Sequence, residues 1–213
     1  MRVTKHEHAY LTIEKDGETL VVDPGGFAPD LGSLENVTAI VVTHEHGDHW
    51  SPAHLARIRE LFPEAPILTT AATAATAPVD ATVVAPGDAV EAGAFSLRFF
   101  GGTHAEIHRS IPLIDNVGVL VDGAFYYPGD SYAVPEGVDV ELLAAPIGAP
   151  WLKIGEAMDF VLAVAPRAAF GTHDGTLSAA AIPMHRDRLA WAAAQGGGVF
   201  HPLDPGDAVE ISA

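Results

Sequence analysis

Apolar residues alternate with polar ones, or run together in short blocks, along most of the chain. Residues 9–26, AYLTIEKDGETLVVDPGG, alternate around Asp16-Gly17, which predicts a β-hairpin. A second hairpin is expected over 117–130, around Asp122-Gly123. Further strands are predicted at 38–42, 66–70, 81–85, 95–102, 138–146 and 167–175, and two short ones in the tail 199–211.

Helical spacing of apolar residues is found in three longer segments. Residues 51–62 carry Ser51 as the expected N-cap and Pro52 at the first helical position. Segments 153–165 and 184–195 predict two more helices, the last ending at glycines 196–198. Residues 71–77 predict a short helix or turn. The order of elements, strands first and then strands alternating with helices, predicts a mixed α/β (α+β) fold.

Length and composition fit one folded domain. The chain has 213 residues, 48% of them apolar, and no Gly/Ser linker marks a boundary, so we expect a single domain over 1–213. It has no cysteine, which excludes disulfides and thiolate metal sites. The N-terminus lacks the apolar run of a signal peptide, and no segment approaches the roughly 20 apolar residues that cross a bilayer. We therefore expect a cytoplasmic protein without a membrane partner.

The charge is strongly negative. There are 28 acidic against 11 basic residues, a formal net charge of -17. Such a surface repels phosphate backbones, so no nucleic-acid partner is expected. Bound divalent metals would offset part of this charge locally, which leaves an anionic small-molecule substrate open. Nothing in the sequence indicates the oligomeric state.

Candidate metal ligands stand just after four predicted strands. The stretch THEHGDH (43–49) follows strand 38–42 and has the pattern H-x-H-x-D-H. Single candidates follow three later strands, and the carboxyl ends of strands are where α/β proteins bind ligands. The seven candidates are His44, His46, Asp48, His49, His104, Asp130 and His173. Seven groups exceed the needs of one ion and suit two metals about 3.5–4 Å apart with a shared carboxylate. The alternative is a solvated polar loop.

These residues carry a family resemblance. THEHGDH (43–49), GTH (102–104), PGDS (128–131) and GTHDG (171–175), in this order, resemble the metallo-β-lactamase superfamily. The opening segment 8–25 resembles the first hairpin of its broad branch of metal-dependent hydrolases, which includes sugar-phosphate lactonase-like proteins. The similarity extends to the closing LDPGDAVEI (203–211), and so spans nearly the whole chain.

The resemblance implies a four-layer αββα sandwich with a dimetal site at one edge. By that similarity His44, His46 and His104 would hold the first metal. Asp48, His49 and His173 would hold the second, and Asp130 would bridge the two. Many antibiotic-hydrolysing members carry a cysteine where this chain has Asp130, which favours ester, lactone or phosphodiester chemistry over β-lactam hydrolysis.

The expected function is hydrolysis by a bridging hydroxide. Two divalent ions, Zn²⁺ in the first place with Mn²⁺ or iron as alternatives, would lower the pKa of a bridging water and stabilise the oxyanion. Asp48 is the candidate catalytic residue that orients the hydroxide. The proton for the leaving group has three candidate sources, namely His108, Tyr127 and a metal-bound water. Two other functions stay open: a metal-binding protein without turnover, and a diiron redox enzyme.

Several other residues have both a functional and a purely structural interpretation. His6 and His8 are expected on one face of a strand, with His8 at the border of the pocket or on the surface. Asp23 is expected beside a metal-binding histidine or in a turn. Trp151 and Lys153 form either a packed loop or a substrate rim. The candidates His54 and His185 are expected to be ordinary helix residues.

Overall fold

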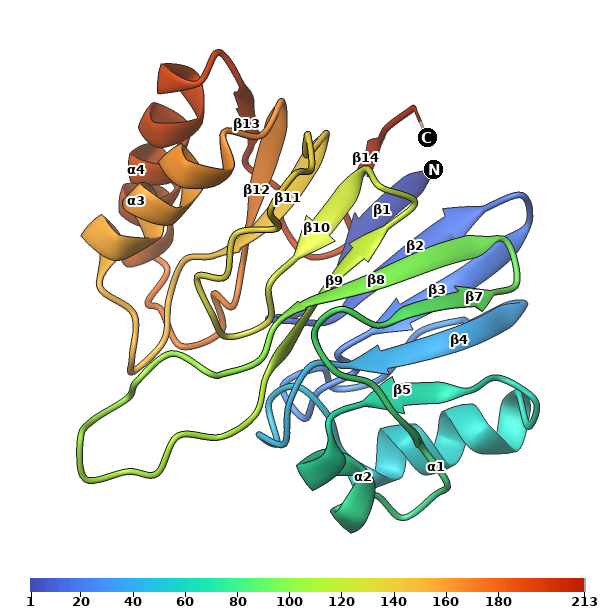
Figure 1. The fold of residues 1–213 in the computed structure, drawn as a ribbon. Helices are drawn as coiled ribbons and strands as arrows, with labels where there is room; N and C mark the ends of the chain where they lie inside the picture. Colours follow the sequence, from blue (N-terminus) through green and yellow to red (C-terminus); the bar gives the residue numbers. More distant parts are fainter. Residues whose placement is uncertain (213) are drawn as a thin grey trace.

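The computed structural model describes residues 1–212 as two seven-stranded sheets packed face to face, with helices outside (Figure 1). The first sheet has the order β14 (Ala208–Glu210), β1 (Arg2–Lys5), β2 (Leu11–Lys15), β3 (Glu18–Val22), β4 (Val37–Val42), β5 (Ile67–Thr69), β6 (Thr82–Val83). The second has the order β13 (Val199–His201), β12 (Ala168–Thr172), β11 (Leu142–Pro146), β10 (Phe125–Tyr127), β9 (Val117–Val121), β8 (Phe95–Gly101), β7 (Ala89–Ala92).

Both sheets are antiparallel on one side and parallel on the other. In the first, β3, β4, β5 and β6 run parallel, and in the second β10, β11, β12 and β13 do. Parallel strands of one sheet end at the same edge, so the loops after β10 and β12 lie at one edge of the second sheet. The loop after β4 joins this sheet where the Val117 amide donates to the Thr43 carbonyl at 3.0 Å.

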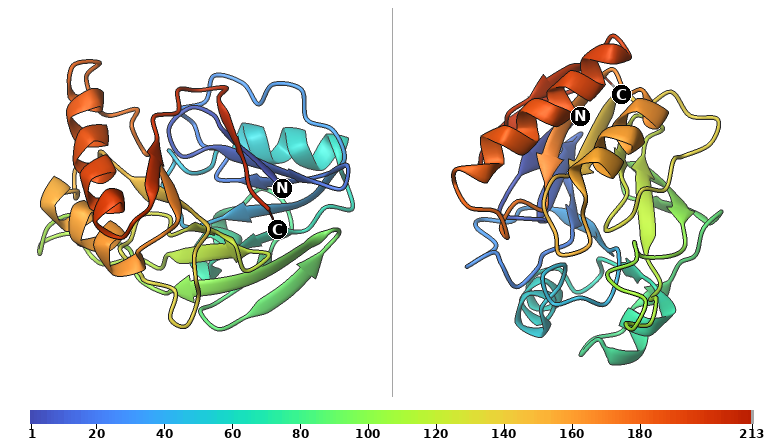
Figure 2. Two further views of the ribbon diagram at one scale, coloured as in Figure 1. Left: turned by 90° about the horizontal axis from the view of Figure 1, so that it is seen from above. Right: turned by 90° about the vertical axis from the view of Figure 1, so that its left-hand side faces the viewer.

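Two helices cover the outer face of each sheet. On the first sheet lie α1 (Pro52–Leu61) and α2 (Ala71–Thr76), and on the second α3 (Ile154–Val164) and α4 (Ala181–Gln195). Figure 2 shows α3 and α4 on the opposite side of the molecule from α1. The predicted four-layer αββα sandwich is therefore confirmed.

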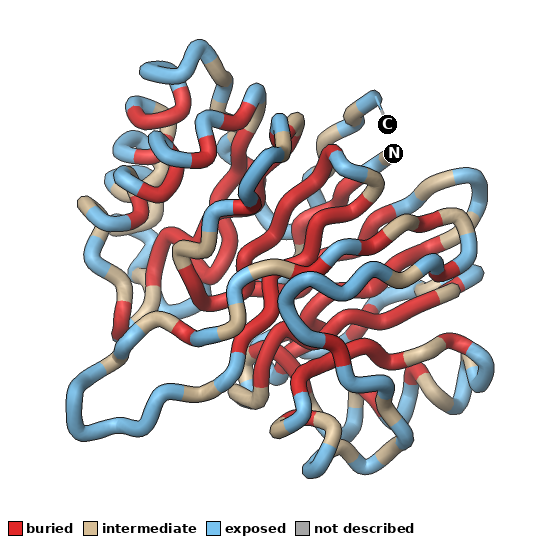
Figure 3. Tube along the Cα trace, viewed as in Figure 1, coloured by how far each residue is buried: buried red, intermediate tan, exposed pale blue. Residues whose placement is uncertain are grey.

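Three clusters of buried apolar residues hold the layers together. Figure 3 shows the buried residues along the strands and on the helix faces turned towards the sheets. The largest lies between the sheets and includes Leu20, Val41, Phe95 and Phe125, none of which is exposed to solvent. The second joins α3 and α4 to their sheet, and the third joins α1 to the other. Removal of this apolar surface from water is the main force that stabilises the sandwich.

The predicted hairpins and helices form where expected, with a few shifts. Both hairpin turns place Asp and Gly at positive φ, as tight turns of this kind require. Ser51 caps α1 by accepting a hydrogen bond from the His54 amide. The last helix begins at Ala181, ahead of the predicted 184, because Pro183 is tolerated within a first helical turn. Strands β1 and β7 had not been predicted.

Candidate metal centre

The four predicted strand ends meet at one edge of the sandwich. His44 follows β4 of the first sheet, while His104, Asp130 and His173 follow β8, β10 and β12 of the second. Each of these four residues is at most 4% exposed. The expectation that separate strands bring these groups together is confirmed.

The candidate ligands form two adjoining groups. One contains His44, His46, His104 and Asp130, and the other contains His8, Asp48, His49 and His173. Within each group, one potential ligand atom per residue lies within 4.8 Å of all the others. All seven predicted residues are included: the five histidines and Asp48 are divided as the resemblance implied, Asp130 falls in the first group, and His8 joins the second.

Asp130 lies between the two groups. Its Oδ2 is 3.3 Å from Nε2 of His104 and 3.1 Å from Nε2 of His173. Its Oδ1 is 3.2 Å from Nε2 of His49. This position agrees with the bridging role that the resemblance implied for Asp130.

Hydrogen bonds fix which nitrogen of three histidines faces the centre. Nδ1 of His49 lies 2.6 Å from Oδ2 of Asp23, and Nδ1 of His104 lies 2.6 Å from the Ala105 carbonyl. Nδ1 of His173 lies against the Gly148 carbonyl. A carboxylate or carbonyl only accepts, so each ring donates from Nδ1 and directs Nε2 inward.

The same reasoning applies to His44. The Thr43 hydroxyl donates to Oδ2 of Asp23 at 2.7 Å, so its oxygen accepts from Nδ1 of His44 at 3.0 Å. Nε2 of His44 then faces Nδ1 of His46 at 3.0 Å. Two ring nitrogens at this distance, both directed inward, suit two ligands of one ion.

A cation between the inward-facing ring nitrogens and carboxylate oxygens would satisfy these atoms. Within residues 1–212, the buried Nε2 atoms of His49, His104 and His173 and Oδ1 of Asp130 have no hydrogen-bond partner. Donors about 2.0–2.2 Å from a shared tetrahedral ion stand roughly 3.3–3.6 Å apart. The nitrogen–oxygen distances to Asp130 of 3.1–3.3 Å are close to this spacing. The residues therefore fit divalent cations.

The pKa shifts of His173, His49 and Asp130 also show that these carboxylates are stabilised by positive charge. Burial opposes protonation of His173, but the carboxylates of Asp130 and Asp48 outweigh it and raise its pKa to about 9. Burial likewise opposes the charge of His49, yet Asp130 and Asp23 hold its pKa well above the ordinary value. Burial favours the neutral acid of Asp130, but His49 and His173 hold its pKa well below the usual range. Carboxylates here require protons or a metal nearby.

Asp23 organises the loop that carries the first ligands. It is fully buried and accepts from the Thr43 amide at 2.8 Å, as well as from the Thr43 hydroxyl and His49. The Tyr127 hydroxyl donates to the same carboxylate at 2.9 Å. The prediction that Asp23 lies beside a metal-binding histidine agrees with this position. Tyr127 was a candidate proton donor to the leaving group, but it is buried and its proton is committed to Asp23.

Two residues hold Asp130 in place. The Trp151 indole donates to Oδ2 of Asp130 at 2.9 Å, and the Asp130 amide donates to Oδ1 of Asn116 at 3.0 Å. Gly129, the residue before Asp130, has φ +62°, and a Cβ there would lie 2.5 Å from Oδ1 of Asn116. No sequence pattern pointed to Asn116, because its role depends on β9 lying beside the loop after β10.

Several other predicted residues take different positions from those expected. His6 and His8 do not share a strand face, because β1 ends at Lys5 and both histidines lie in the turn before β2. His6 contacts Thr12, whereas His8 is 1% exposed and contacts Asp48. The candidate pair at the rim also separates: Trp151 is buried against Asp130, and Lys153 is exposed.

Three histidines outside the site have hydrogen-bond partners away from it. His108 is exposed and pairs with Ser110 in the long loop between β8 and β9 (Figure 1). His54 pairs with the Pro24 carbonyl, and His185 with the Ile147 carbonyl. His54 and His185 thus tie helices to loops, as ordinary helix residues do.

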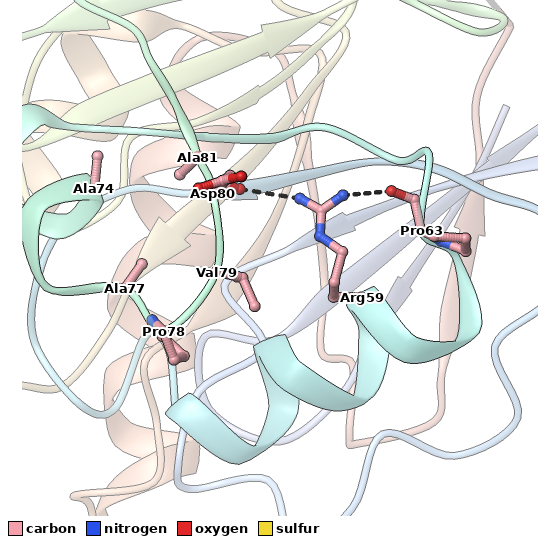
Figure 4. A pocket seen from close by; sticks show the side chains of 8 residues that line it. All are labelled: Arg59, Pro63, Ala74, Ala77, Pro78, Val79, Asp80 and Ala81. Carbon is pink, nitrogen blue, oxygen red and sulfur yellow. Dashed lines mark hydrogen bonds between the residues drawn. The ribbon is translucent and has the colours of Figure 1, made fainter.

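A hollow elsewhere offers no comparable chemistry. It has a volume of about 820 Å³ and lies beside α1 and α2 (Figure 4). Its Arg59 donates to the carbonyls of Pro63 and Asp80, and none of its lining residues belongs to the two groups.

Among the described residues, no helix has the length and apolar character needed to cross a membrane.

Comparison with known proteins agrees with the fold and the site. The family model described as "Beta-lactamase superfamily domain" matches residues 2–173. Protein Rv0786c of Mycobacterium tuberculosis is 34% identical over 194 residues, which cover 89% of this chain and 91% of that protein.

Two solved structures share the fold. Igni18, a metallo hydrolase from Ignicoccus hospitalis, has a TM-score of 0.73 at 16% identity, with 99% of both chains covered. CmlA, a diiron β-hydroxylase from Streptomyces venezuelae, has a TM-score of 0.73 at 15% identity, with 99% of this chain and 54% of that chain covered. At these identities the likeness concerns the fold. The sequence matches over most of the chain show that it belongs to the metallo-β-lactamase superfamily.

Proposed function

We propose that the protein is a metal-dependent hydrolase that holds two divalent ions and cleaves a small ester, lactone or phosphodiester. His44, His46 and His104 would hold one ion, Asp48, His49 and His173 the other, and Asp130 both. Zn²⁺ suits these nitrogen and oxygen donors, and Mn²⁺ or iron accept the same set.

The observation that carries the proposal is the common direction of the ring nitrogens. His44, His49, His104 and His173 each commit Nδ1 to an acceptor in the surrounding protein. Their Nε2 atoms therefore converge on the carboxylate of Asp130. A core histidine with an ordinary structural role would satisfy both nitrogens, and four that leave the inner one for a shared centre are typical of a metal site.

Bound ions would supply Lewis acidity and a water of lowered pKa. The protein contributes the rest. Asp23 holds the ring of His49 through Nδ1, and Trp151 with Asn116 holds the carboxylate of Asp130. Asp48 and His46 are half-buried, whereas the other five candidate ligands are buried, and 23% of the Asp48 side chain is exposed, so it borders the open side of the site. This position supports the proposal that Asp48 orients the attacking water.

A redox function is the second candidate. CmlA shares this fold and is a diiron enzyme, and the donor set here accepts iron as well as zinc. The third candidate is a protein that binds metal but has lost turnover. All seven candidate positions are intact and brought together, which favours a working site over a relic.

The test is a panel of carboxylic ester, lactone and phosphodiester substrates, run on the wild type and on Asp48→Ala, each loaded with Zn²⁺ or Mn²⁺. We expect turnover of at least one class by the wild type, with a loss of about 100-fold or more in Asp48→Ala. Equal background rates in both proteins would reject the hydrolase. An iron-dependent visible absorption in the purified protein would favour the redox function.

A further inference from the structure

His8 differs from His44, His49, His104 and His173 in the hydrogen bond that its outer ring nitrogen makes. It lies among potential ligands, with its Nε2 directed at Oδ2 of Asp48 at 3.1 Å. We infer that His8 is not a metal ligand but a positioning residue, whose Nε2–H donates to Asp48 and fixes the orientation of that carboxylate. The consequence for catalysis rests on the proposed function, but the hydrogen-bonding arrangement itself does not.

The other ring nitrogen of His8 determines which tautomer the ring adopts. The backbone amide of Gly175 donates to Nδ1 of His8 at 3.0 Å. A backbone N–H can only donate, so Nδ1 of His8 bears the lone pair. The proton of the neutral ring is then on Nε2, the atom that faces Asp48. A protonated Nε2 offers no lone pair to a metal.

Three histidines of the two groups show the opposite arrangement. His49, His104 and His173 donate from Nδ1 to a carboxylate or a carbonyl, which leaves their Nε2 atoms free to ligate. Proximity alone would place His8 with them. The difference is chemical, because the outer partner of His8 is a donor and the outer partners of the others are acceptors.

The backbone around His8 is built for this orientation. His8 has φ +60°, a left-handed conformation that is uncommon for a residue with a side chain. The His173 amide donates to the His8 carbonyl at 2.9 Å, and this joins the turn after β1 to the loop after β12. A Cβ on Gly175 would lie 2.9 Å from Nδ1 of His8, so glycine permits the close approach. Strain of this kind is maintained only where the surroundings determine it strongly.

A buried ion pair reinforces the same junction. Lys5 is completely buried, and its Nζ lies 3.1 Å from Oδ2 of Asp174, the residue after His173. The ammonium also donates to the His6 carbonyl at 3.1 Å. Lys5 thereby links the turn that carries His8 to the loop that carries His173.

Packing leaves the ring little freedom. The His8 ring lies between the rings of Phe27 and His173, with centroids 4.5 and 3.9 Å away, and it is 1% exposed. Oδ2 of Asp48 lies between His8 and Nε2 of His173, at 3.1 and 3.4 Å. A fixed donor on this oxygen limits rotation of the carboxylate, which both holding a metal and orienting a water require.

The direct test is the tautomer of His8 in solution. Long-range ¹H–¹⁵N spectra of protein labelled with ¹⁵N-histidine distinguish a protonated Nε2 from a protonated Nδ1, and the His8→Gln variant assigns the signal. We expect His8 to be protonated on Nε2 in both the metal-free and the Zn²⁺-loaded protein. Protonation on Nδ1 with a metal-bound Nε2 would overturn the inference.

Two substitutions separate a donor from a ligand. His8→Gln retains an N–H near the position of Nε2, whereas His8→Phe keeps a ring without a donor. We expect the weaker-bound Zn²⁺ to lose affinity about 10–100-fold in His8→Phe and about threefold or less in His8→Gln. Loss of one whole metal per chain, equal in both variants, would show that His8 is a ligand. Because the tautomer is also read without metal, failure of the proposed function leaves this test intact.

Discussion

At the scale of single residues, Asp23 shows how the site depends on groups outside the candidate ligand set. Its carboxylate accepts from the amide and the hydroxyl of Thr43, from Nδ1 of His49 and from the hydroxyl of Tyr127. These four donors belong to three residues in two segments of the chain, and Asp23 itself lies in a third. They link the loop after β3, the ligand loop after β4 and the strand β10.

Asp23→Asn should therefore damage both stability and metal binding. The amide presents N–H groups to buried donors, so we expect the free energy of unfolding to fall by about 2–4 kcal/mol and metal affinity to fall about 10–100-fold. Tyr127→Phe is the graded control, since it removes one donor of four and should cost about 1 kcal/mol with both metals retained. Urea unfolding and metal titration measure the two effects. Equal losses in the two variants would contradict the role of Asp23.

A second prediction concerns pH and His6. Burial, together with the charge of Lys5, lowers the pKa of His6 to about 4, and its ring stacks on Tyr10 with centroids 4.2 Å apart. The unfolded chain therefore binds a proton at His6 near pH 6.5, well before the folded protein does. His6 thus contributes stability above pH 6.5 that is lost as the pH falls towards 4.

We expect the His6→Gln variant to lose less stability than the wild type over this interval, by about 3 kcal/mol at most. The comparison uses denaturant unfolding at several pH values between 6.5 and 4. Because all other titrating groups are common to both proteins, their difference isolates His6. Parallel pH profiles would show that its ring is not held neutral.

The residues that meet at the site were predictable from the sequence, but their protonation was not. His44, His104, Asp130 and His173 stand directly after apolar runs, and that position carries information. Which ring nitrogen faces inward depends on carbonyls such as that of Gly148, which the fold brings from a distant loop. The positioning residues Asn116 and Lys5 were missed for the same reason, since neither follows a strand end.

At the scale of elements, prediction succeeded where a pattern had a turn signal beside it. Both hairpins carried Asp-Gly, and α1 carried Ser51-Pro52. Strand β1 was missed because RVTK is short and polar, and its burial comes from β2 and β14 on its two sides. Strand β7 was missed because AVEA has weak β propensity and forms only as the partner of β8.

Close contact between two loops leads to a prediction at this scale. The loop after β3 presses on the ligand loop, and a Cβ on Gly25 would lie 1.7 Å from the Asp48 carbonyl oxygen. Gly25→Ala must therefore displace the backbone of a ligand. We expect the free energy of unfolding to fall by about 2–3 kcal/mol and the affinity for metal to fall with it.

The matched control is Gly155→Ala in the first turn of α3. A Cβ there has no atom within 4 Å, and alanine favours the helix over glycine by up to about 1 kcal/mol. This variant should be as stable as the wild type or slightly more stable, with unchanged metal binding. Thermal unfolding compares the two variants, and an unaltered Gly25→Ala protein would refute the close contact.

At the scale of the whole molecule, the site joins the two sheets. His44, His46, Asp48 and His49 come from the first sheet, and His104, Asp130 and His173 from the second. An ion bound by both therefore stabilises the packed sandwich against the unfolded chain. The acidic surface, with its net charge of -17, also favours the approach of cations.

Removal of metal should accordingly lower the melting temperature. Each ion present at about 100 times its Kd stabilises by about 2.7 kcal/mol, which corresponds to a shift of roughly 5–10 °C per ion for a chain of this size. Calorimetry before and after dialysis against a chelator measures the shift, and added Zn²⁺ should restore it. A melting temperature that is insensitive to the chelator would contradict a metal held between the sheets.

The most direct measurement is the metal content of the protein purified without added metal, by elemental analysis. We predict about two divalent ions per chain, with the first ion reduced or lost in His104→Ala, because Nε2 of His104 lies in the ligand group with Asp130. His108→Ala, which removes an exposed histidine from the same loop, should retain both. A wild type with about zero ions per chain, unchanged after incubation with Zn²⁺ and Mn²⁺, would contradict the dimetal site.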